Sequence, residues 1–464
     1  MAIEQRVESM DLIQSDKRRL IVGLGVTGLS CLRHFVRQGI AVSVFDTREN
    51  PPNLAQIRAE FPDLTLHLGV QSVAIVDAAD EIYLSPGIAP NDPFLAAAVA
   101  RGAVIRGDMD LFAEQAAAPI IAISGSNAKS TVTSLVGEMA RCAGLDVGVG
   151  GNLGTPALEL LSPQRDCYVL ELSSFQLERC ETFRATVGCV LNVSADHIDR
   201  HENMINYHRA KQSLYRGVEV AIFNRDDGLT TPLAAAGMRL HSFSLQAPDL
   251  NHYGLREFDG QSWIVRGLER LLAVADIPLV GRHNLLNVVA ALAIGEAAGF
   301  ELTAMQRAVK QFRGLPHRCE AVACIDGVRY INDSKATNVA ATVAAIEGLS
   351  PDVVGKTLLI AGGVTKSADF SPLVAALAGS DCQLLLYGEG AATIAEAVPV
   401  VPLHRADNLA EAVAMAAEIA AAGDLVLLSP ACASFDQFRD FSHRGEVFVE
   451  AVEKLAAQRG GLSC

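Results

Sequence analysis

The chain has 464 residues, of which half are hydrophobic and only 5% aromatic, and its formal net charge is −15. This length predicts about three domains, and the abundance of Ala, Val, Leu and Gly is typical of α/β proteins with buried parallel strands. The acidic balance argues against a nucleic-acid-binding surface, so an anionic substrate would need local basic groups and metal rather than the global field.

The first twenty residues, Met1 to Leu20, are charged and lack the apolar segment of a signal peptide. No later run approaches the roughly 18 apolar residues that a membrane span requires. The ten cysteines are scattered and include no C-x-x-C pair, which argues against zinc and thioredoxin-like redox chemistry. We therefore expect a cytoplasmic protein of a reducing compartment, without membrane insertion.

The stretch 19–30 reads as a strand, a glycine turn and the start of a helix, with the complete G-x-G-x-x-G motif at Gly23, Gly25 and Gly28. A second strand, 41–45, ends at Asp46, 18 residues after Gly28. Such an acid holds a ribose in NAD enzymes, so the segment alone suggests an oxidoreductase. The polar pair Thr47-Arg48 and the general affinity of glycine turns for diphosphates weigh against NAD. A turn whose glycines serve packing alone is the other alternative.

A third strand, 81–85, ends in the turn Pro86-Gly87, at the sheet edge where ligands of open α/β sheets bind. We place the end of this first domain near Gly107.

The stretch 118–133 is the centre of the prediction. An apolar strand (118–123) leads into a small-residue loop (124–128), and a helical pattern begins at Lys129. Free N–H groups of a first helical turn, with the helix dipole, bind phosphate. Lys129 can reach terminal phosphates and Ser130 or Thr131 can hold Mg²⁺, so this segment predicts ATP binding.

The phosphate loop departs from G-x-x-x-x-G-K-[ST], because Ile123 and Ala128 stand at the two glycine positions. A Cβ at Ala128 costs roughly 1–2 kcal/mol if that residue needs a positive φ, and much less otherwise. The alternative is an ordinary strand-to-helix turn with a solvated lysine.

Downstream, a helix runs to about Cys142, and 148–154 is expected to be a glycine-rich loop that approaches a ligand. The strand 167–171 ends in Glu171, a candidate Mg²⁺ ligand, since hard cations bind carboxylate and hydroxyl oxygens. A solvated loop glutamate is the alternative.

The strand 188–192 leads into a loop that carries four titratable side chains, at Asp196, His197, Asp199 and His201. Such clusters mark metal or acid–base chemistry, although we expect one or two of them only to cap the following helix. Lys211, in a helical stretch (207–215), is a solvated lysine by default. Another helix opens near 279–292, where Asn284 is either a cap or a functional group and Asn287 shares its face.

The last third alternates strands and helices, which predicts a second doubly wound sheet. The stretch 328–338 is expected to be a strand that runs into a loop with Asp333, Lys335 and Thr337, and further strands are expected at 357–360, 383–387 and 424–428. Polar loops follow the first, second and fourth of these strands, whereas Gly388 follows the third. Three such loops at carboxyl ends of strands predict a substrate pocket, although each could be turn chemistry alone.

Together these motifs resemble the Mur ligase family of ATP-dependent amide-forming enzymes, and the last three resemble its D-glutamate-adding branch. The motifs are Gly125-Ser-Asn-Ala-Lys-Ser-Thr131, Gly151-Asn-Leu-Gly154, Glu171-Leu-Ser-Ser-Phe-Gln176, Asn192-Val-Ser-Ala-Asp-His197, Tyr207-x-x-Ala-Lys211, Gly281-Arg-His-Asn-x-x-Asn287, Asn332-Asp-Ser-Lys-Ala-Thr-Asn338, 362–370 and 429–438.

The resemblance implies three α/β domains. They are a Rossmann-like N-terminal domain (1–107) for the UDP substrate, a central P-loop ATPase-like domain (108–312) for ATP and Mg²⁺, and a C-terminal Rossmann-like doubly wound domain (313–464) for the amino acid. It implies that D-glutamate is added to UDP-N-acetylmuramoyl-L-alanine through an acyl phosphate in cytoplasmic peptidoglycan precursor synthesis, by a monomer. We expect the last domain to close onto the others during turnover.

The family's functional residues carry over to matching positions here. For the UDP substrate they are Gly25, Val26, Thr27, Asp46, Thr47, Arg48, Gly87 and Asn152, the last also near the metal. For ATP they are Gly125, Ser126, Asn127, Ala128, Lys129, Ser130, Thr131, Asn284, Asn287, Arg318, Asp333 and Lys335. For D-glutamate they are Thr337, Lys366, Ser434 and Phe441. The metal ligands are Ser130 and Glu171 for one Mg²⁺ and His197 and Lys211, as a CO2-derived carbamate, for a second; Lys129, Glu171, His197 and Lys211 form the catalytic group.

Two departures from the family pattern concern Ala128, in place of a glycine, and Ala195, in place of an acid. Three alternatives remain open: a related Mur or folylpolyglutamate-type ligase, an NAD-dependent oxidoreductase, and a non-catalytic nucleotide-binding regulator. The oxidoreductase leaves the phosphate loop unexplained, and a regulator has no need of Glu171, His197 and Lys211 together.

Overall fold

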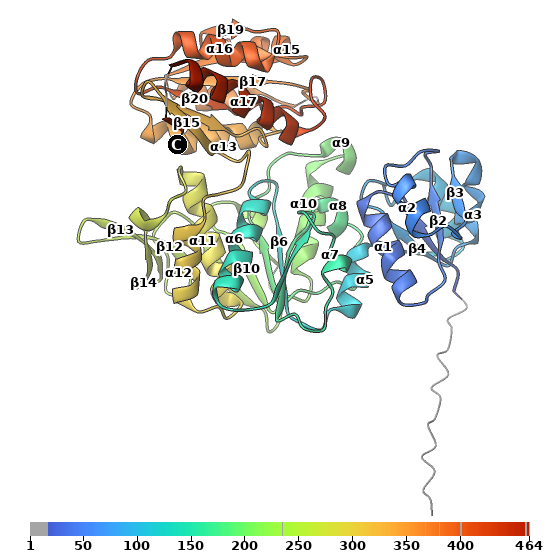
Figure 1. Cartoon of the computed structure of the whole chain (residues 1–464). Helices are drawn as coiled ribbons and strands as arrows, with labels where there is room; N and C mark the ends of the chain where they lie inside the picture. The colour runs from blue at the N-terminus through green and yellow to red at the C-terminus, as the bar shows by residue number, and fades with distance from the viewer. Residues whose placement is uncertain are drawn as a thin grey trace, which may run out of the picture. The chain divides into compact units, whose positions relative to one another are not determined.

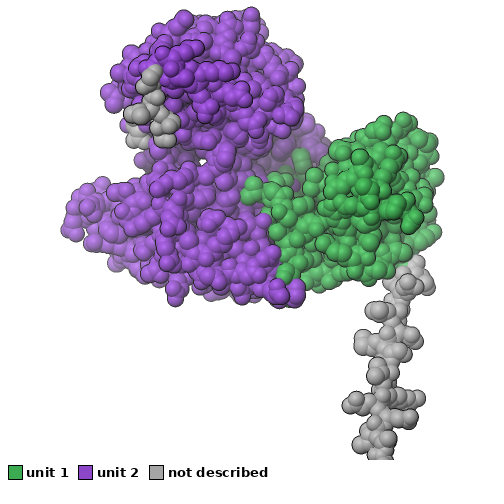
Figure 2. Space-filling model, viewed as in Figure 1, with its two compact units in different colours: residues 1–117, 150–162, 174–183 green, residues 118–149, 163–173, 184–464 purple. Residues whose placement is uncertain are grey.

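The computed structural model describes residues 17–233, 235–366, 368–379, 381–399, 401–459 and 462–463. The prediction that Met1 to Leu20 is not a signal peptide falls almost wholly outside these residues. Within them the strands form three sheets (Figure 1), as the three-domain α/β prediction requires. Two compact units contain the sheets, one of residues 1–117, 150–162 and 174–183, the other of 118–149, 163–173 and 184–464 (Figure 2).

The first unit contains a parallel sheet in the order β3-β2-β1-β4-β5, which confirms the Rossmann-like prediction. The strands are β1 (Arg19–Val22), β2 (Ser43–Asp46), β3 (Leu66–Leu68), β4 (Glu81–Leu84) and β5 (Val104–Arg106). The helices are α1 (Val26–Arg37), α2 (Leu54–Glu60), α3 (Ala74–Ala78), α4 (Ala96–Ala100), α5 (Asp108–Gln115), α7 (Ala157–Leu160) and α8 (Ser174–Leu177).

The second unit begins with a sheet in the order β14-β13-β12-β11-β10-β9-β6-β8-β7. Its strands are β6 (Ile120–Ser124), β7 (Val147–Gly151), β8 (Cys167–Glu171), β9 (Val187–Val190), β10 (Val220–Asn224), β11 (Arg239–Phe243), β12 (Tyr253–Phe258), β13 (Gln261–Arg266) and β14 (Glu269–Ala273). Its helices are α6 (Lys129–Cys142), α9 (Ile198–His201), α10 (Met204–Gln212), α11 (Arg282–Ala297) and α12 (Leu302–Gln311). The strands β12 to β14 pair antiparallel, and α6 packs against both α11 and α12.

One sequence expectation about this sheet is wrong. The stretch 148–154 is not a loop throughout, because Gly148, Gly150 and Gly151 belong to β7. A Cβ at Gly148 would lie 2.8 Å from Cδ1 of Tyr168, and one at Gly150 would lie 2.2 Å from the carbonyl oxygen of Thr155. Close packing within the protein therefore accounts for Gly148 and Gly150, and the loop starts only at Asn152.

The same unit contains a C-terminal sheet in the order β19-β18-β17-β20-β16-β15-β21. Its strands are β15 (Glu320–Ile325), β16 (Val328–Asn332), β17 (Thr357–Gly362), β18 (Cys382–Tyr387), β19 (Leu403–Arg405), β20 (Leu425–Leu428) and β21 (Leu462–Ser463). Its helices are α13 (Val339–Leu349), α14 (Ser371–Ala378), α15 (Ala391–Ala397), α16 (Leu409–Ile419) and α17 (Phe441–Arg459). The strands from β19 to β16 are parallel, while β15 and β21 run antiparallel at one edge.

Burial of both faces explains why this sheet is doubly wound. All six residues of β17 are buried, and alternate residues belong to two different apolar clusters. Leu359 packs with residues of α13 and α14, whereas Leu358 packs with residues of α16 and α17. Because successive side chains of a strand point to opposite faces of the sheet, β17 contributes to two apolar cores. Among the described helices, none is long and apolar enough to cross a membrane.

Candidate active site

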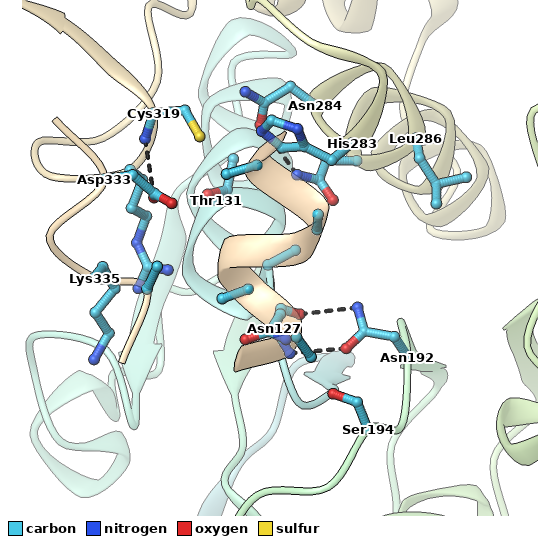
Figure 3. A pocket seen from close by; sticks show the side chains of 18 of the residues that line it. Asn127, Thr131, Asn192, Ser194, His283, Asn284, Leu286, Cys319, Asp333 and Lys335 are labelled. Carbon is cyan, nitrogen blue, oxygen red and sulfur yellow. Dashed lines mark hydrogen bonds between the residues drawn. The ribbon is translucent and has the colours of Figure 1, made fainter. Parts of the chain in front are cut away.

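The phosphate loop joins β6 to α6 and is held in place by the end of β9. The backbone N–H of Ser126 donates to the carbonyl oxygen of Asn192, 2.9 Å away. The Asn192 side chain accepts from the N–H of Asn127 at 2.8 Å and donates to its carbonyl at 3.2 Å (Figure 3). Asn192 thus fixes the loop conformation, a role that the sequence did not assign to it.

Ala128 adopts the left-handed conformation that the sequence left undecided. Its φ is 67°, and it is the residue immediately before α6, with no side-chain cap on the helix N-terminus. Because only glycine adopts this conformation freely, the Ala128 Cβ costs about 1–2 kcal/mol. The uncapped N–H groups of the first turn are the donors that a phosphate needs.

Ser130 and Glu171 meet as the magnesium prediction requires. The Ser130 hydroxyl donates to Oε2 of Glu171 at 2.6 Å, and both side chains are buried. Arg318, from the chain segment before β15, donates to the same hydroxyl oxygen at 2.7 Å. A buried hydroxyl and carboxylate at this distance form a donor set that suits Mg²⁺.

Lys129 does not behave as a solvated lysine. Its Nζ donates to the carbonyl oxygens of Gly125 and Ser126, both at 2.9 Å, so it folds over its own loop. Burial lowers its pKa, with the charge of Arg318 acting in the same direction and that of Glu171 opposing it.

Lys211 contradicts the default interpretation of a solvated lysine even more strongly. Lys211 is only 1% exposed, and its Nζ donates to the carbonyl oxygen of Gly125 at 2.7 Å. It lies 4.7 Å from the centre of the Tyr207 ring, and the Tyr207 hydroxyl is 2.8 Å from Oγ of Ser126. Burial, aided by the charge of Lys129, holds the pKa of Lys211 well below its usual range.

The loop after β9 positions His197 near Asp196. Nε2 of His197 is 3.6 Å from Oδ2 of Asp196, and burial lowers the pKa of this histidine. His197 is the N-cap residue of α9, which has no side-chain cap, so the expected capping role of these side chains is wrong for α9. His201 is buried against Tyr207. In the described ranges, no three His, Cys, Asp or Glu residues lie in an arrangement that could hold a metal ion.

A pocket of about 310 Å³ opens beside the phosphate loop (Figure 3). It brings together eight of the residues predicted to bind ATP: Asn127, Ala128, Thr131, Asn284, Asn287, Arg318, Asp333 and Lys335. Four small residues of α13, Ala340, Ala341, Ala344 and Ala345, also line this pocket. A pocket lined by small apolar residues and by a few amide side chains suits a flat heteroaromatic base.

Asn284 and Asn287 act as a pair on α11. Asn287 donates to Oδ1 of Asn284 at 3.2 Å, and Asn284 donates to the Val280 carbonyl at 2.9 Å. The interpretation of Asn284 as the helix cap is wrong, because Gly281 is the N-cap residue. The prediction that Asn284 and Asn287 lie on the same face of the helix is confirmed.

Asp333 and Lys335 line the pocket from the C-terminal sheet. Asp333 accepts from the Ser429 hydroxyl at 2.9 Å and from the Cys319 N–H at 3.2 Å, and burial raises its pKa to about 7. Burial lowers the pKa of Lys335 to about 8, and its ammonium lies 4.0 Å from the centre of the Phe441 ring.

The four residues predicted for D-glutamate lie on three loops and the start of α17. Thr337 follows β16, Lys366 follows β17 with a φ of 49°, and Ser434 follows β20 and is buried. Phe441 is the first residue of α17. A bridge between Val364 and Ala433 joins the second and third loops.

The residues predicted for the UDP substrate lie in the first unit. Val26 and Thr27 begin α1 after Gly25, and Asp46, the last residue of β2, is followed by Thr47 and Arg48. Gly87 follows β4, and Asn152 follows β7. Asp46 accepts from the Leu24 N–H at 2.7 Å and from Nη2 of Arg48 at 2.7 Å. Burial alone would raise the pKa of Asp46, but these hydrogen bonds lower it. The Asp46 carboxylate therefore already has two partners in the protein.

Family models match three successive parts of the chain. They describe a Mur ligase MurD-like N-terminal domain (17–107), a Mur ligase middle domain (123–295) and a Mur ligase glutamate ligase domain (317–432).

Curated relatives and solved structures give a consistent result. A UDP-N-acetylmuramoylalanine–D-glutamate ligase of Marinobacter nauticus is 53% identical over 96% of this chain and 100% of its own length. The enzyme of the same name from Pseudomonas aeruginosa is 51% identical with the same coverage. Among solved structures, a MurF from Acinetobacter baumannii has a TM-score of 0.59 at 17% identity, over 94% of this chain and 90% of its own. A MurF ligase from Thermotoga maritima in complex with ADP has a TM-score of 0.57 at 15% identity, over 96% and 97%. These structures support the fold alone.

Proposed function

Because the chain belongs to the Mur ligase family, we propose that it is an ATP-dependent ligase that joins D-glutamate to UDP-N-acetylmuramoyl-L-alanine. The proposal depends chiefly on one observation: Lys129, Ser130 and Glu171 meet at an uncapped helix N-terminus, in a chain that is 53% and 51% identical, over 96% of its length, to ligases named for this reaction. The product would serve peptidoglycan precursor synthesis. We further propose a cytoplasmic monomer with functional domains at 1–107, 108–312 and 313–464.

The reaction needs activation of a poor acyl donor. The carboxylate of the alanyl substrate attacks the γ-phosphorus of ATP, which forms an acyl phosphate and releases ADP. The D-glutamate amine, after loss of a proton, then attacks the acyl carbon, and the bond to the phosphate oxygen breaks. Phosphoryl transfer depends on positioning and charge neutralisation more than on covalent help from the protein.

The phosphate loop supplies the positioning for the first step. The N–H groups at the start of α6 bind phosphate oxygens, and Lys129 exchanges its two carbonyl acceptors for them. Ser130 and Glu171 would hold one Mg²⁺, which neutralises phosphate charge when bound. The amides of Asn284 and Asn287 and the α13 face of the 310 Å³ pocket would hold the base of ATP, with Arg318, Asp333 and Lys335 on the ribose and phosphate side.

Lys211 suits the carbamate that the family resemblance implies. CO2 adds to a neutral amine, which loses one proton to give an N-carbamate. The lowered pKa of Lys211 favours that neutral amine, since charging a buried ammonium is costly. With His197, the carbamate would hold a second Mg²⁺. Thr337, Lys366, Ser434 and Phe441 would bind D-glutamate, and the first-unit residues with Asn152 would bind the UDP substrate.

One assay tests the proposal. Phosphate release is measured with ATP, Mg²⁺ and UDP-N-acetylmuramoyl-L-alanine across a panel of D- and L-amino acids, and we expect release only with D-glutamate. A preference for L-alanine, a diamino acid or a dipeptide would reassign the chain to another ligase of the family. Release independent of any amino acid would overturn the ligase proposal.

A further inference from the structure

Arg444 is a fully buried arginine that none of the proposed catalytic or binding roles uses. It lies in the first turn of α17, three residues after Phe441, and its exposed fraction is 0%. Burial of a guanidinium is costly unless its donors are satisfied, so the contacts of this side chain indicate its role.

The Arg444 guanidinium binds two loops at once. Its Nε donates to Oγ of Ser334 at 3.0 Å, and its Nη2 donates to the Ser334 carbonyl at 2.7 Å. Its Nη1 donates to the Cys432 carbonyl at 3.0 Å. The Ser334 hydroxyl in turn donates to the Phe441 carbonyl at 2.7 Å. One side chain therefore connects the loop after β16, the loop after β20 and the N-terminus of α17.

These contacts lie close, along the chain, to the residues of the proposed amino-acid pocket. Thr337 is three residues after Ser334, Ser434 is two residues after Cys432, and Phe441 is one helical turn before Arg444. Lys366 lies in the loop after β17, which the Val364–Ala433 bridge joins to the loop after β20. A shift of the guanidinium would move all of these positions.

The charge of Arg444 is not neutralised within the described part of the chain. All three of its acceptors are uncharged oxygens, and no carboxylate there lies within ion-pair distance of it. Asp436, which shares Tyr387 as a neighbour with Arg444, instead accepts from the Glu389 N–H at 3.1 Å. A buried cation without an anionic partner favours binding of an anion nearby.

We propose that Arg444 is the positioning residue that adapts the amino-acid pocket to a dicarboxylic substrate. It fixes the Ser334 and Cys432 loops, and it supplies a buried positive charge next to them. This inference rests on the proposed function, because it takes D-glutamate as the amino acid.

The test uses Arg444→Met, which removes charge and donors at similar length, and Arg444→Lys, which keeps the charge. We expect the KM for D-glutamate to rise at least tenfold in Arg444→Met, with the KM values for ATP and the UDP substrate changed less than twofold. Arg444→Lys should recover a large part of this loss. Ser334→Ala, which removes one of the bonded atoms, should raise the same KM about threefold and gives a milder variant if Arg444→Met does not fold.

Val452→Ala is the matched control. Val452 is buried in the same helix, and its apolar cluster contains neither Ser334 nor Cys432. This substitution should lower the unfolding temperature without changing the KM for D-glutamate. An unchanged KM in both Arg444→Met and Ser334→Ala, a parallel rise in all three KM values, or Arg444→Lys no better than Arg444→Met would overturn the inference while wild-type activity stands. If wild-type protein shows no activity that depends on D-glutamate, the proposed function fails, and this inference fails with it.

Discussion

The molecule contains two strand–loop–helix turns of the same kind, and they meet different demands. The turn from β1 to α1 has glycine at each crowded position: Gly23 has a φ of 92°, and a Cβ on Gly28 would lie 1.9 Å from the Gly23 carbonyl oxygen. The turn from β6 to α6 accepts Ala128 at a φ of 67° and carries Lys129 and Ser130 instead.

The difference follows from what each loop packs against. The first loop fits tightly against its own helix and against Ser85, so side-chain volume is excluded there. The acid that accompanies this loop, Asp46, accepts hydrogen bonds from the Leu24 N–H and from Arg48. The second loop is held by hydrogen bonds to Asn192 and contains Ala128, and its acid, Glu171, accepts a hydrogen bond from the Ser130 hydroxyl, a pair that suits a metal. The turn from β1 to α1 is thus suited to close packing of its backbone, and the turn from β6 to α6 is suited to binding charged groups.

The largest expected effect comes from removing the charge of the second turn. Lys129→Ala should lower turnover by a factor of about 1,000 or more, equivalent to about 4 kcal/mol in the barrier. Phosphate release at saturating substrates measures it. Calorimetric binding of the UDP substrate is the control and should not change; a variant that retains a tenth of wild-type turnover would contradict the charge-neutralising role.

The next effect concerns volume in the first turn. Gly28→Ala forces a methyl group against the Gly23 carbonyl and should destabilise the first unit by about 3 kcal/mol. Urea unfolding with a fluorescent or circular dichroism readout measures it. Gly25→Ala is the matched control, because its Cβ would meet nothing within 4 Å. It should leave stability within about 0.5 kcal/mol while weakening binding of the UDP substrate; equal destabilisation by both would contradict the packing explanation.

A smaller effect is expected at acid pH, because the pKa of Asp46 is lowered in the folded state. The stabilisation is fully present above the unfolded-state pKa of about 3.9 and is lost as pH falls through the lower folded pKa. Asp46→Asn should cost about 1–2 kcal/mol at pH 7, and this difference from wild type should shrink towards pH 2. Thermal unfolding as a function of pH measures it, and a pH-independent difference would show that charge is not the cause.

The smallest effect is expected at Ala128. Ala128→Gly relieves the strain of the left-handed conformation but enlarges the conformational freedom of the unfolded chain. The free energy of unfolding should change by less than about 1.4 kcal/mol, and turnover should stay within about tenfold of wild type. A loss of turnover comparable to that of Lys129→Ala would mean that the methyl group itself contacts the substrate.

Periodicity and turn residues predicted ten of the 21 strands of the described residues, because buried parallel strands appear in the sequence as short apolar runs. The strand 167–171 and the helix start at Lys129 match the structure residue for residue. The glycines of β7 misled the prediction, since glycine marks close packing in a strand as well as freedom in a loop. The antiparallel strands β12 to β14 were not predicted at all, because their pattern is weaker.

The site was only partly predictable for a related reason. Residues with chemically distinctive side chains in short motifs, such as Ser130 and Glu171, were identified as candidates from their neighbours along the chain. Lys211 was unremarkable until its burial was known, and only the resemblance pointed to it. Asn192, Tyr207 and Arg444 act through partners many residues away, and no local pattern records a contact of that kind.

The first unit is assembled from three separate pieces of chain, since 150–162 and 174–183 belong to it as well as the first 117 residues. Asp110 accepts hydrogen bonds from the N–H groups of Glu181, Thr182 and Phe183, and Glu159 pairs with Arg33. During synthesis on the ribosome, the N-terminal sheet therefore emerges long before its last supports. Its completion must wait for about 70 further residues, and a fragment cut at residue 117 would be left without them.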